Sequence, residues 1–204
     1  MNRTSLLRGW PLVGVIAFAI LANSAAIALS DEHVEAVRRV IRVTARSSIT
    51  LFLLAFTAAA VWRFWPNAWT RWQRQNRRYL GVSFAVSHFV HLAAILELQR
   101  IAPDVVGANA ITWIGGGLAY VFIAAMTITS FDRTTNMIGP RAWKVLHTTG
   151  SYYIWLIFAS SYVGRALQMP AYIPVAALVL GALGLRIAAR IARSREQQAL
   201  AVTS

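Results

Sequence analysis

The sequence has no cysteine, and it has few charged residues for its length. Without cysteine, the chain can form no disulfide framework, no cysteine-ligated iron–sulfur cluster and no covalent c-type heme attachment, whereas non-covalent heme stays possible. Charged residues make up 13% of the 204 residues, against about 25% in an average soluble domain. Long apolar runs account for this deficit, which points away from a soluble catalytic domain and toward a membrane protein.

Six apolar runs are each close to the length of a membrane-spanning helix. About 20 helical residues cross about 30 Å of hydrocarbon at about 1.5 Å per residue. We therefore predict an all-α, polytopic membrane protein, with residues 1–204 forming a single transmembrane domain that folds as a six-transmembrane-helix bundle. The predicted spans are Trp10–Leu29, Ser47–Trp65, Leu80–Leu98, Ile111–Phe131, Trp143–Val163 and Tyr172–Ile187.

Three local features refine this prediction. The first run is long for a signal peptide, so residues 1–29 are expected to stay on the chain. The segment 31–46 has helical spacing, so the second helix is expected to begin before its apolar part. Pro140 follows Gly139 and is expected to begin the fifth helix, because proline is favoured in the first turn of a helix.

The net charge is strongly positive and unevenly placed. There are 20 Lys and Arg residues against 7 Asp and Glu, which gives +13. Because the arginines lie between apolar runs, their expected partner is the lipid bilayer and not a nucleic acid. Fourteen of the 20 lie in the two tails, in the connections after the second and fourth runs, or at the ends of the runs that adjoin them. This bias predicts both termini in the cytoplasm, with a basic tail over about residues 188–204, in the cell inner membrane. Four arginines between residues 38 and 46 oppose the bias, because they lie on the outer side of the membrane in this topology.

Three histidines lie within the predicted spans, and they are the candidate metal ligands: His91, His147 and His88. An imidazole in lipid costs free energy unless its polar atoms are satisfied, so it is a functional hypothesis by default. His88 and His91 share one face of their helix, and His147 lies one turn into a parallel helix. These side chains could simply bond to neighbouring helices. Zinc lacks a cysteine or a well-placed carboxylate here, whereas heme needs only one or two axial imidazoles, an apolar slot and cations for its propionates.

Motifs around these histidines resemble a known family. The motifs are Arg77-Arg78-x-Leu80-Gly81 followed by His91, Trp143-Lys-Val-Leu-His147 followed by Tyr152, and the segment Thr44-Ala-Arg46-Ser-Ser. Together they resemble the ferric reductase-like transmembrane domain family over about residues 40–165. Within that family they are most similar to the heme-binding membrane subunits of bacterial periplasmic methionine-sulfoxide reductase systems.

The resemblance implies b-type heme, one or two per chain, between the helices that carry His91 and His147. Both histidines fall on family ligand positions. Arg46 falls where an arginine could meet heme propionates, and Arg77 falls where related oxidases carry an inner histidine; with Arg78 these residues are the cofactor-binding candidates. The family usually has a second histidine further along the fifth helix, where this chain has the pair 160–161, both serine.

The function that the resemblance implies is electron transfer across the membrane. Electrons would come from a separate cytoplasmic flavoprotein or from quinol, and would leave to a periplasmic acceptor protein. The chain has no flavin or nicotinamide motif, because Gly115–Gly117 lies inside a predicted helix with no strand before it. We predict no catalytic residue, so the chain would be at most the membrane electron-transfer component of an oxidoreductase. A basic face including Arg71, Arg74 and Lys144 could dock an acidic reductase.

The residues leave several arrangements open. Counted along their helices, His147 differs in height from His88 by about 6 Å and from His91 by about 10 Å. One heme could lie between His147 and the other two histidines, two hemes could each have a weak or absent second ligand, or the site could have decayed. The competing function is a heme-free membrane scaffold or partner subunit. A proton-coupled transporter using the histidines as a relay is less favoured, because broken helices are not predicted.

Overall fold

The computed structural model describes residues 6–30, 32–106 and 110–202 of the chain. These residues form helices and no β-strand, which confirms the all-α prediction for the described part of the chain. The elements are α2 (Gly9–Ser30), α3 (His33–Phe64), α4 (Ala68–Gln75), α5 (Arg77–Ile101), α6 (Pro103–Val106), α7 (Ala110–Ile128), α8 (Asp132–Ala166), the 3-10 helix η1 (Pro170–Tyr172) and α9 (Ile173–Val202).

Several helices are long and apolar enough to cross a membrane. Four meet this description by themselves: α2, α3, α5 and the continuous stretch Pro170–Ala201. A fifth span results if the bent pair Thr112–Ile128 and Asp132–Ala166 is counted as one. The chain is therefore a multi-pass membrane protein with four to five candidate spans in its described part, compared with the six predicted.

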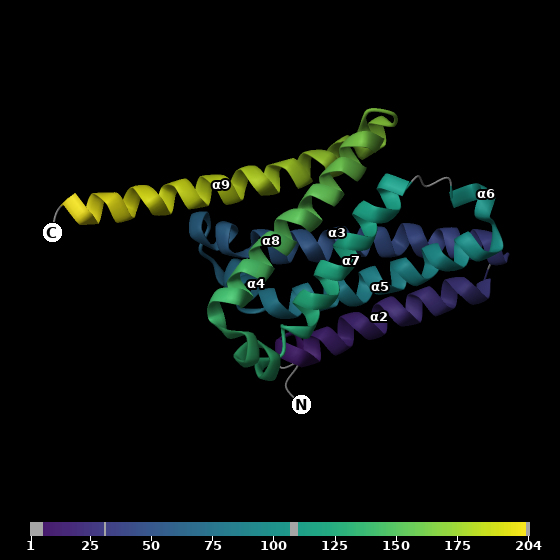
Figure 1. The fold of residues 1–204 in the computed structure, drawn as a ribbon, viewed down its shortest axis with the longest axis horizontal. Helices are drawn as coiled ribbons and strands as arrows, with labels where there is room; N and C mark the ends of the chain where they lie inside the picture. Colours follow the sequence, from purple (N-terminus) through teal and green to yellow (C-terminus); the bar gives the residue numbers. More distant parts are fainter. Residues whose placement is uncertain (1–5, 31, 107–109, 203–204) are drawn as a thin grey trace.

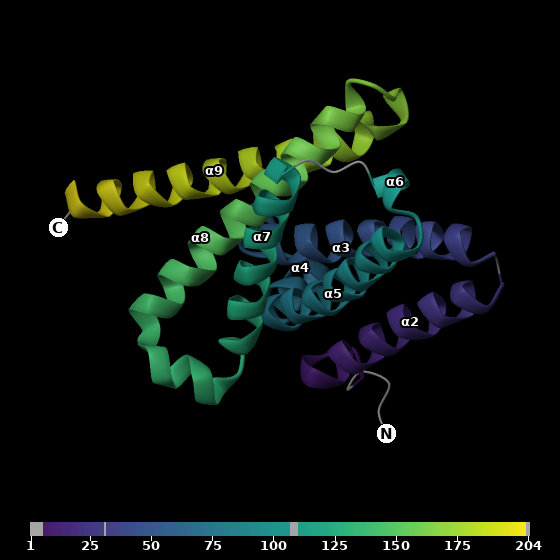
Figure 2. The same cartoon turned by 45° about the vertical axis from the view of Figure 1, so that its right-hand side comes forward.

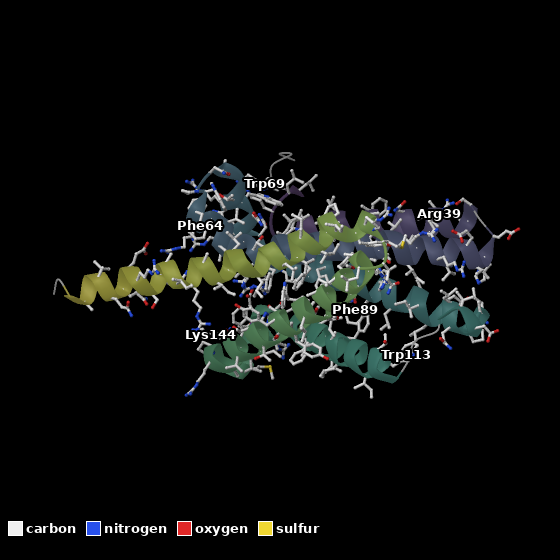
Figure 3. The ribbon with its side chains drawn as sticks, turned by 90° about the horizontal axis from the view of Figure 1, so that it is seen from above. Arg39, Phe64, Trp69, Phe89, Trp113 and Lys144 are labelled. Carbon is white, nitrogen blue, oxygen red and sulfur yellow. The ribbon has the colours of Figure 1, made fainter. Side chains whose placement is uncertain are left out.

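Helices α2, α3 and α5 lie side by side, and α9 extends past them toward the C-terminus (Figure 1). As predicted, α3 begins well before its apolar part, at His33; residue 31 lies outside the described residues. Figure 3 labels Arg39 and Phe64 near the two ends of this helix. The α9 helix continues to Val202, beyond the predicted end at residue 187, and an ion pair between Arg63 and Glu196 holds it beside the end of α3.

Small polar side chains bring α3 and α5 close together. Thr44, Ser48 and Ser87 are fully buried between these helices. The Ser87 hydroxyl lies 2.8 Å from Ser47 Oγ and 2.9 Å from Ser48 Oγ, and it donates to the Thr44 carbonyl oxygen at 3.2 Å. Small residues that bond across the contact are the usual means by which membrane helices approach, because lipid gives no hydrophobic drive between them.

Replacing Ser87 by leucine is expected to destabilise the protein. The larger side chain has no space between α3 and α5, and overpacking of this kind costs about 1–3 kcal/mol. Thermal unfolding of the detergent-purified variant measures the effect. Ser160→Leu is the matched control, because Ser160 is exposed and bonds only to the Ile157 carbonyl oxygen of its own helix. Equal midpoints for the two variants would contradict the close α3–α5 contact.

The connection between α7 and α8 is a sharp turn (Figure 2). The two helices are bent by 113° relative to each other. A second break lies at Gly139, whose φ of 76° and ψ of 163° are not helical, and the regular part of α8 begins at Pro140 as predicted. Glycine suits this position because a side chain disfavours positive φ. The Trp143 indole N–H then donates to the Thr129 carbonyl oxygen at 3.0 Å, which ties the start of α8 to the end of α7.

Candidate functional site

A cavity of about 290 Å³ opens between α3, α5, α7 and α8 beside His147. Its walls are mainly apolar and aromatic, and its polar edge includes Arg74 of α4 together with Arg77 and Arg78 at the start of α5. The lining side chains include Phe52, Phe84, Ile154, Arg77, Arg78 and His147. Apolar walls with one imidazole and a cationic edge suit a flat or elongated apolar molecule that carries negative charge at one end.

The packing of α8 on α7 orients His147. The imidazole stacks on Trp143, four residues earlier, with ring centroids 4.1 Å apart. His147 Nε2 lies 3.0 Å from Thr129 Oγ1, and the Thr129 hydroxyl donates to the Ala125 carbonyl oxygen at 2.7 Å. Because that hydroxyl proton is already used, Nε2–H is the donor to Thr129 in the neutral imidazole. Nδ1 then keeps its lone pair and is the ring nitrogen that remains available to a ligand.

Arg78 lies at the polar edge of the same cavity. Its Nη1 donates to Asp132 Oδ1 at 2.6 Å, and the guanidinium lies over the Trp10 ring at 5.6 Å. Its Nε and Nη2 atoms are buried and have no hydrogen-bond partner among the described residues. Buried donors without partners cost free energy, so a ligand oxygen at this edge would be favourable. Arg77 lines the cavity beside it.

His88 and His91 form a second group on α5. Their rings are stacked 5.3 Å apart, and the His88 ring also lies 4.9 Å from Tyr120 of α7. His91 Nδ1 lies 3.1 Å from the Ile41 carbonyl oxygen and 3.1 Å from Thr44 Oγ1. A carbonyl can only accept, so Nδ1–H of His91 is the donor and Nε2 keeps its lone pair, as in many metal-ligating histidines. His88 Nδ1 is buried without a hydrogen-bond partner in the described part of the chain.

The structure does not bring the paired histidines to His147. His88 lies beside Phe158 of α8, with ring centroids 5.6 Å apart, whereas His147 is eleven residues earlier on that helix. Eleven residues of helix rise correspond to about 16 Å. This separation exceeds the 6 Å expected for His88 and His147, because the expectation counted from Leu80 and Trp143 as if they lay at the same height. Two nitrogens on one metal would be about 4 Å apart at bond lengths of about 2 Å.

No further ligands complete either position. Among the described residues, no three His, Cys, Asp or Glu side chains lie together in a metal-binding group. Ser160 and Ser161, which replace the expected histidine, are both exposed, and Ser160 bonds within its own helix. Each histidine position therefore offers an imidazole from one helix only.

Arg46 lies away from the His147 cavity. It lines a different groove, between α2 and α3, and it is exposed. Of the three arginines expected near a cofactor, Arg77 and Arg78 thus share the cavity with His147, and Arg46 does not.

Sequence reasoning missed the residues that orient the histidines. Thr129 forms a hydrogen bond with His147, and Thr44 forms one with His91. The Ile41 carbonyl oxygen also accepts a hydrogen bond from the His91 ring. A threonine near the end of a span resembles any other threonine, so the sequence carried no specific signal for Thr129. The contact of Trp143 with His147 could be expected from the sequence, because Trp143 lies four residues before His147 and therefore on the same helix face.

Comparison with protein-family models, with curated proteins and with solved structures finds no match for this chain.

Proposed function

We propose that this protein binds b-type heme in the His147 cavity and acts as a membrane electron-transfer subunit. It would pass electrons from a cytoplasmic flavoprotein or quinol to an acceptor on the other side of the membrane. One observation carries the proposal: a single cavity combines an imidazole, aromatic walls and a cationic edge at which Arg78 has two buried donors without a partner among the described residues. The motif resemblance adds independent support.

The residues of the cavity fit the chemical requirements of heme. His147 offers one ring nitrogen as an axial ligand, since Thr129 occupies only Nε2. Phe52, Phe84 and Ile154 form apolar walls that exclude water from the ring. Arg77 and Arg78 supply cations for two propionates. Bound heme would supply reversible one-electron chemistry, while the protein holds its position and sets the polarity around it.

The paired histidines are the second position at which heme could bind. Nε2 of His91 is free for this purpose, and Nδ1 of His88 has no hydrogen-bond partner among the described residues. The separation from His147 favours two independent positions over one heme shared between them. The number of hemes per chain therefore shows whether the paired histidines also bind heme.

The proposed topology has six crossings, with α7 and α8 crossing separately and both termini in the cytoplasm. This topology places most of the positive charge on the cytoplasmic side. Arg71, Arg74 and Lys144 would then belong to a basic surface near the His147 cavity, where an acidic electron donor could dock.

The first experiment is a reduced-minus-oxidised absorption spectrum of the detergent-purified protein, with heme quantified per chain. Expression in cells that make other b-type cytochromes ensures a supply of heme. We expect a b-type spectrum and about one heme per occupied imidazole position. Protein without heme from such cells would contradict the proposal.

A heme-free membrane scaffold or partner subunit is the second candidate function. It is favoured by the hydrogen bonds that already satisfy His91 and His147 through Thr44 and Thr129. In that case the histidines only join helices. The protein would be colourless, and the double variant His91→Ala with His147→Ala would stay folded. Collapse of the colourless double variant would count against the scaffold.

A further inference from the structure

The groove between α2 and α3 has a volume of about 500 Å³ and is separate from the His147 cavity. Its α2 wall runs over residues 15–24, the middle part of an apolar helix that is long enough to cross a membrane. In the proposed topology the groove lies at the depth of the bilayer, and it is open to the surroundings because Arg46, Asn23 and Ala19 on its walls are exposed.

The two ends of the groove differ in polarity. Toward the turn that joins α2 to α3, the walls carry Asn23, Ser24 and Thr44; toward the other end they carry Val15, Ile16, Thr50 and Leu51, and Arg46 lies between these two ends. Asn23 lies seven residues, or about 10 Å, before the end of α2. A molecule that fills this groove would therefore have a polar head near the α2–α3 turn and an apolar chain pointing into the bilayer.

Arg46 lacks a counter-charge. Its guanidinium makes no hydrogen bond or ion pair with another residue in the described ranges. Four of the described acids are paired with other cations: Glu35 with Arg42, Glu97 with His33 and Arg100, Asp132 with Arg78, and Glu196 with Arg63. A cation at membrane depth without a partner is expensive and marks a functional site by default.

We propose that the α2–α3 groove binds one anionic phospholipid, with its phosphate on Arg46 and one acyl chain along residues 15–20 of α2. A guanidinium matches phosphate oxygens in a bidentate contact, and the long Arg46 side chain can extend toward the headgroup region. With the Arg46 side chain extended toward the turn, the amide of Asn23 can donate to an oxygen of the same phosphate. The acyl chain fits the apolar half of the groove, which a free phosphate ion would leave empty.

Native mass spectrometry of the purified full-length protein tests this proposal. Wild-type protein with phosphatidylglycerol is compared with the Arg46→Gln and Arg42→Gln variants. Both substitutions remove one exposed positive charge from α3, but Arg42 is paired with Glu35 and does not line the groove. We expect Arg46→Gln to bind phosphatidylglycerol about tenfold more weakly, the loss expected for a charge-assisted contact, and Arg42→Gln to match wild type.

A second pair of variants keeps Arg46 and blocks the groove. Ala19 is exposed and lines the apolar half of the groove, so Ala19→Trp would fill that half. Ala22 is also exposed but does not line the groove, so Ala22→Trp is the control. Ala19→Trp should lose lipid and Ala22→Trp should retain it, with unchanged thermal unfolding as the check of folding. Equal lipid retention in Arg46→Gln and wild type would overturn the proposal. So would equal retention of phosphatidylcholine, or displacement of the lipid by inorganic phosphate. The readout counts lipid, so it is independent of whether heme binds.

Discussion

Purified His147→Ala protein is expected to lose at least about 90% of the heme bound at the His147 cavity. A loss of about 1.4 kcal/mol in the free energy of heme binding already weakens the affinity tenfold. The cavity offers one imidazole, and no other His, Cys, Asp or Glu of the described residues forms a metal-binding group with it. Alanine removes the axial ligand while the apolar walls stay. Absorbance of the reduced protein, together with heme quantified per chain, measures the loss.

The control for this substitution is His33→Ala. His33 lies at the far end of α3, where it is exposed and bonds to Glu97, so its removal should leave the heme content unchanged. His91→Ala is the informative comparison, because His91 stacks on His88 and does not line the His147 cavity. Loss of all heme in His91→Ala, with none lost in His147→Ala, would assign the cofactor to the paired histidines instead. A spectrum unchanged by His147→Ala would remove His147 as a ligand.

The apolar runs were sufficient to predict most of the helices. A run such as Leu80–Leu98 has one stable form in a bilayer, because every backbone polar group must be paired within the helix. The early start of α3, and the start at Pro140 of the regular part of α8, followed from helical spacing and proline chemistry. The 113° bend between α7 and α8 did not follow, since it depends on packing that local composition does not encode.

The candidate site residues were also visible in the sequence, but their grouping was not. Spacing showed that His88 and His91 share a face, and the structure stacks their rings. Their height relative to His147 depends on how far α8 is shifted along its axis relative to α5. Counting residues along one helix cannot give this shift. Arg46 illustrates the same limit: its position on α3 was known, but only the packing of α2 shows that it faces a separate groove.

Phe52→Ala is expected to cause the largest loss of stability of any substitution considered for this protein. The Phe52 ring is 5% exposed and lies where three helices meet. Its centroid is 5.4 Å from Phe84 of α5, 5.2 Å from Phe158 of α8 and 5.1 Å from Phe56 of its own helix. Removing such a ring leaves a cavity and typically costs about 3–5 kcal/mol. Unfolding by denaturing detergent, followed by circular dichroism, measures the change.

The matched control for Phe52→Ala is Phe18→Ala, because Phe18 on α2 is 74% exposed and faces away from the core. Lipid replaces the contacts of an exposed ring, so this variant should change the unfolding free energy by less than about 0.5 kcal/mol. The comparison isolates packing, since lipid supplies no hydrophobic drive between helices and the aromatic contacts themselves must hold α3, α5 and α8 together. Equal losses in the two variants would mean that the Phe52 cluster does not join these helices in the membrane. A large loss in Phe52→Ala alone would confirm that the aromatic contacts of Phe52 hold α3, α5 and α8 together.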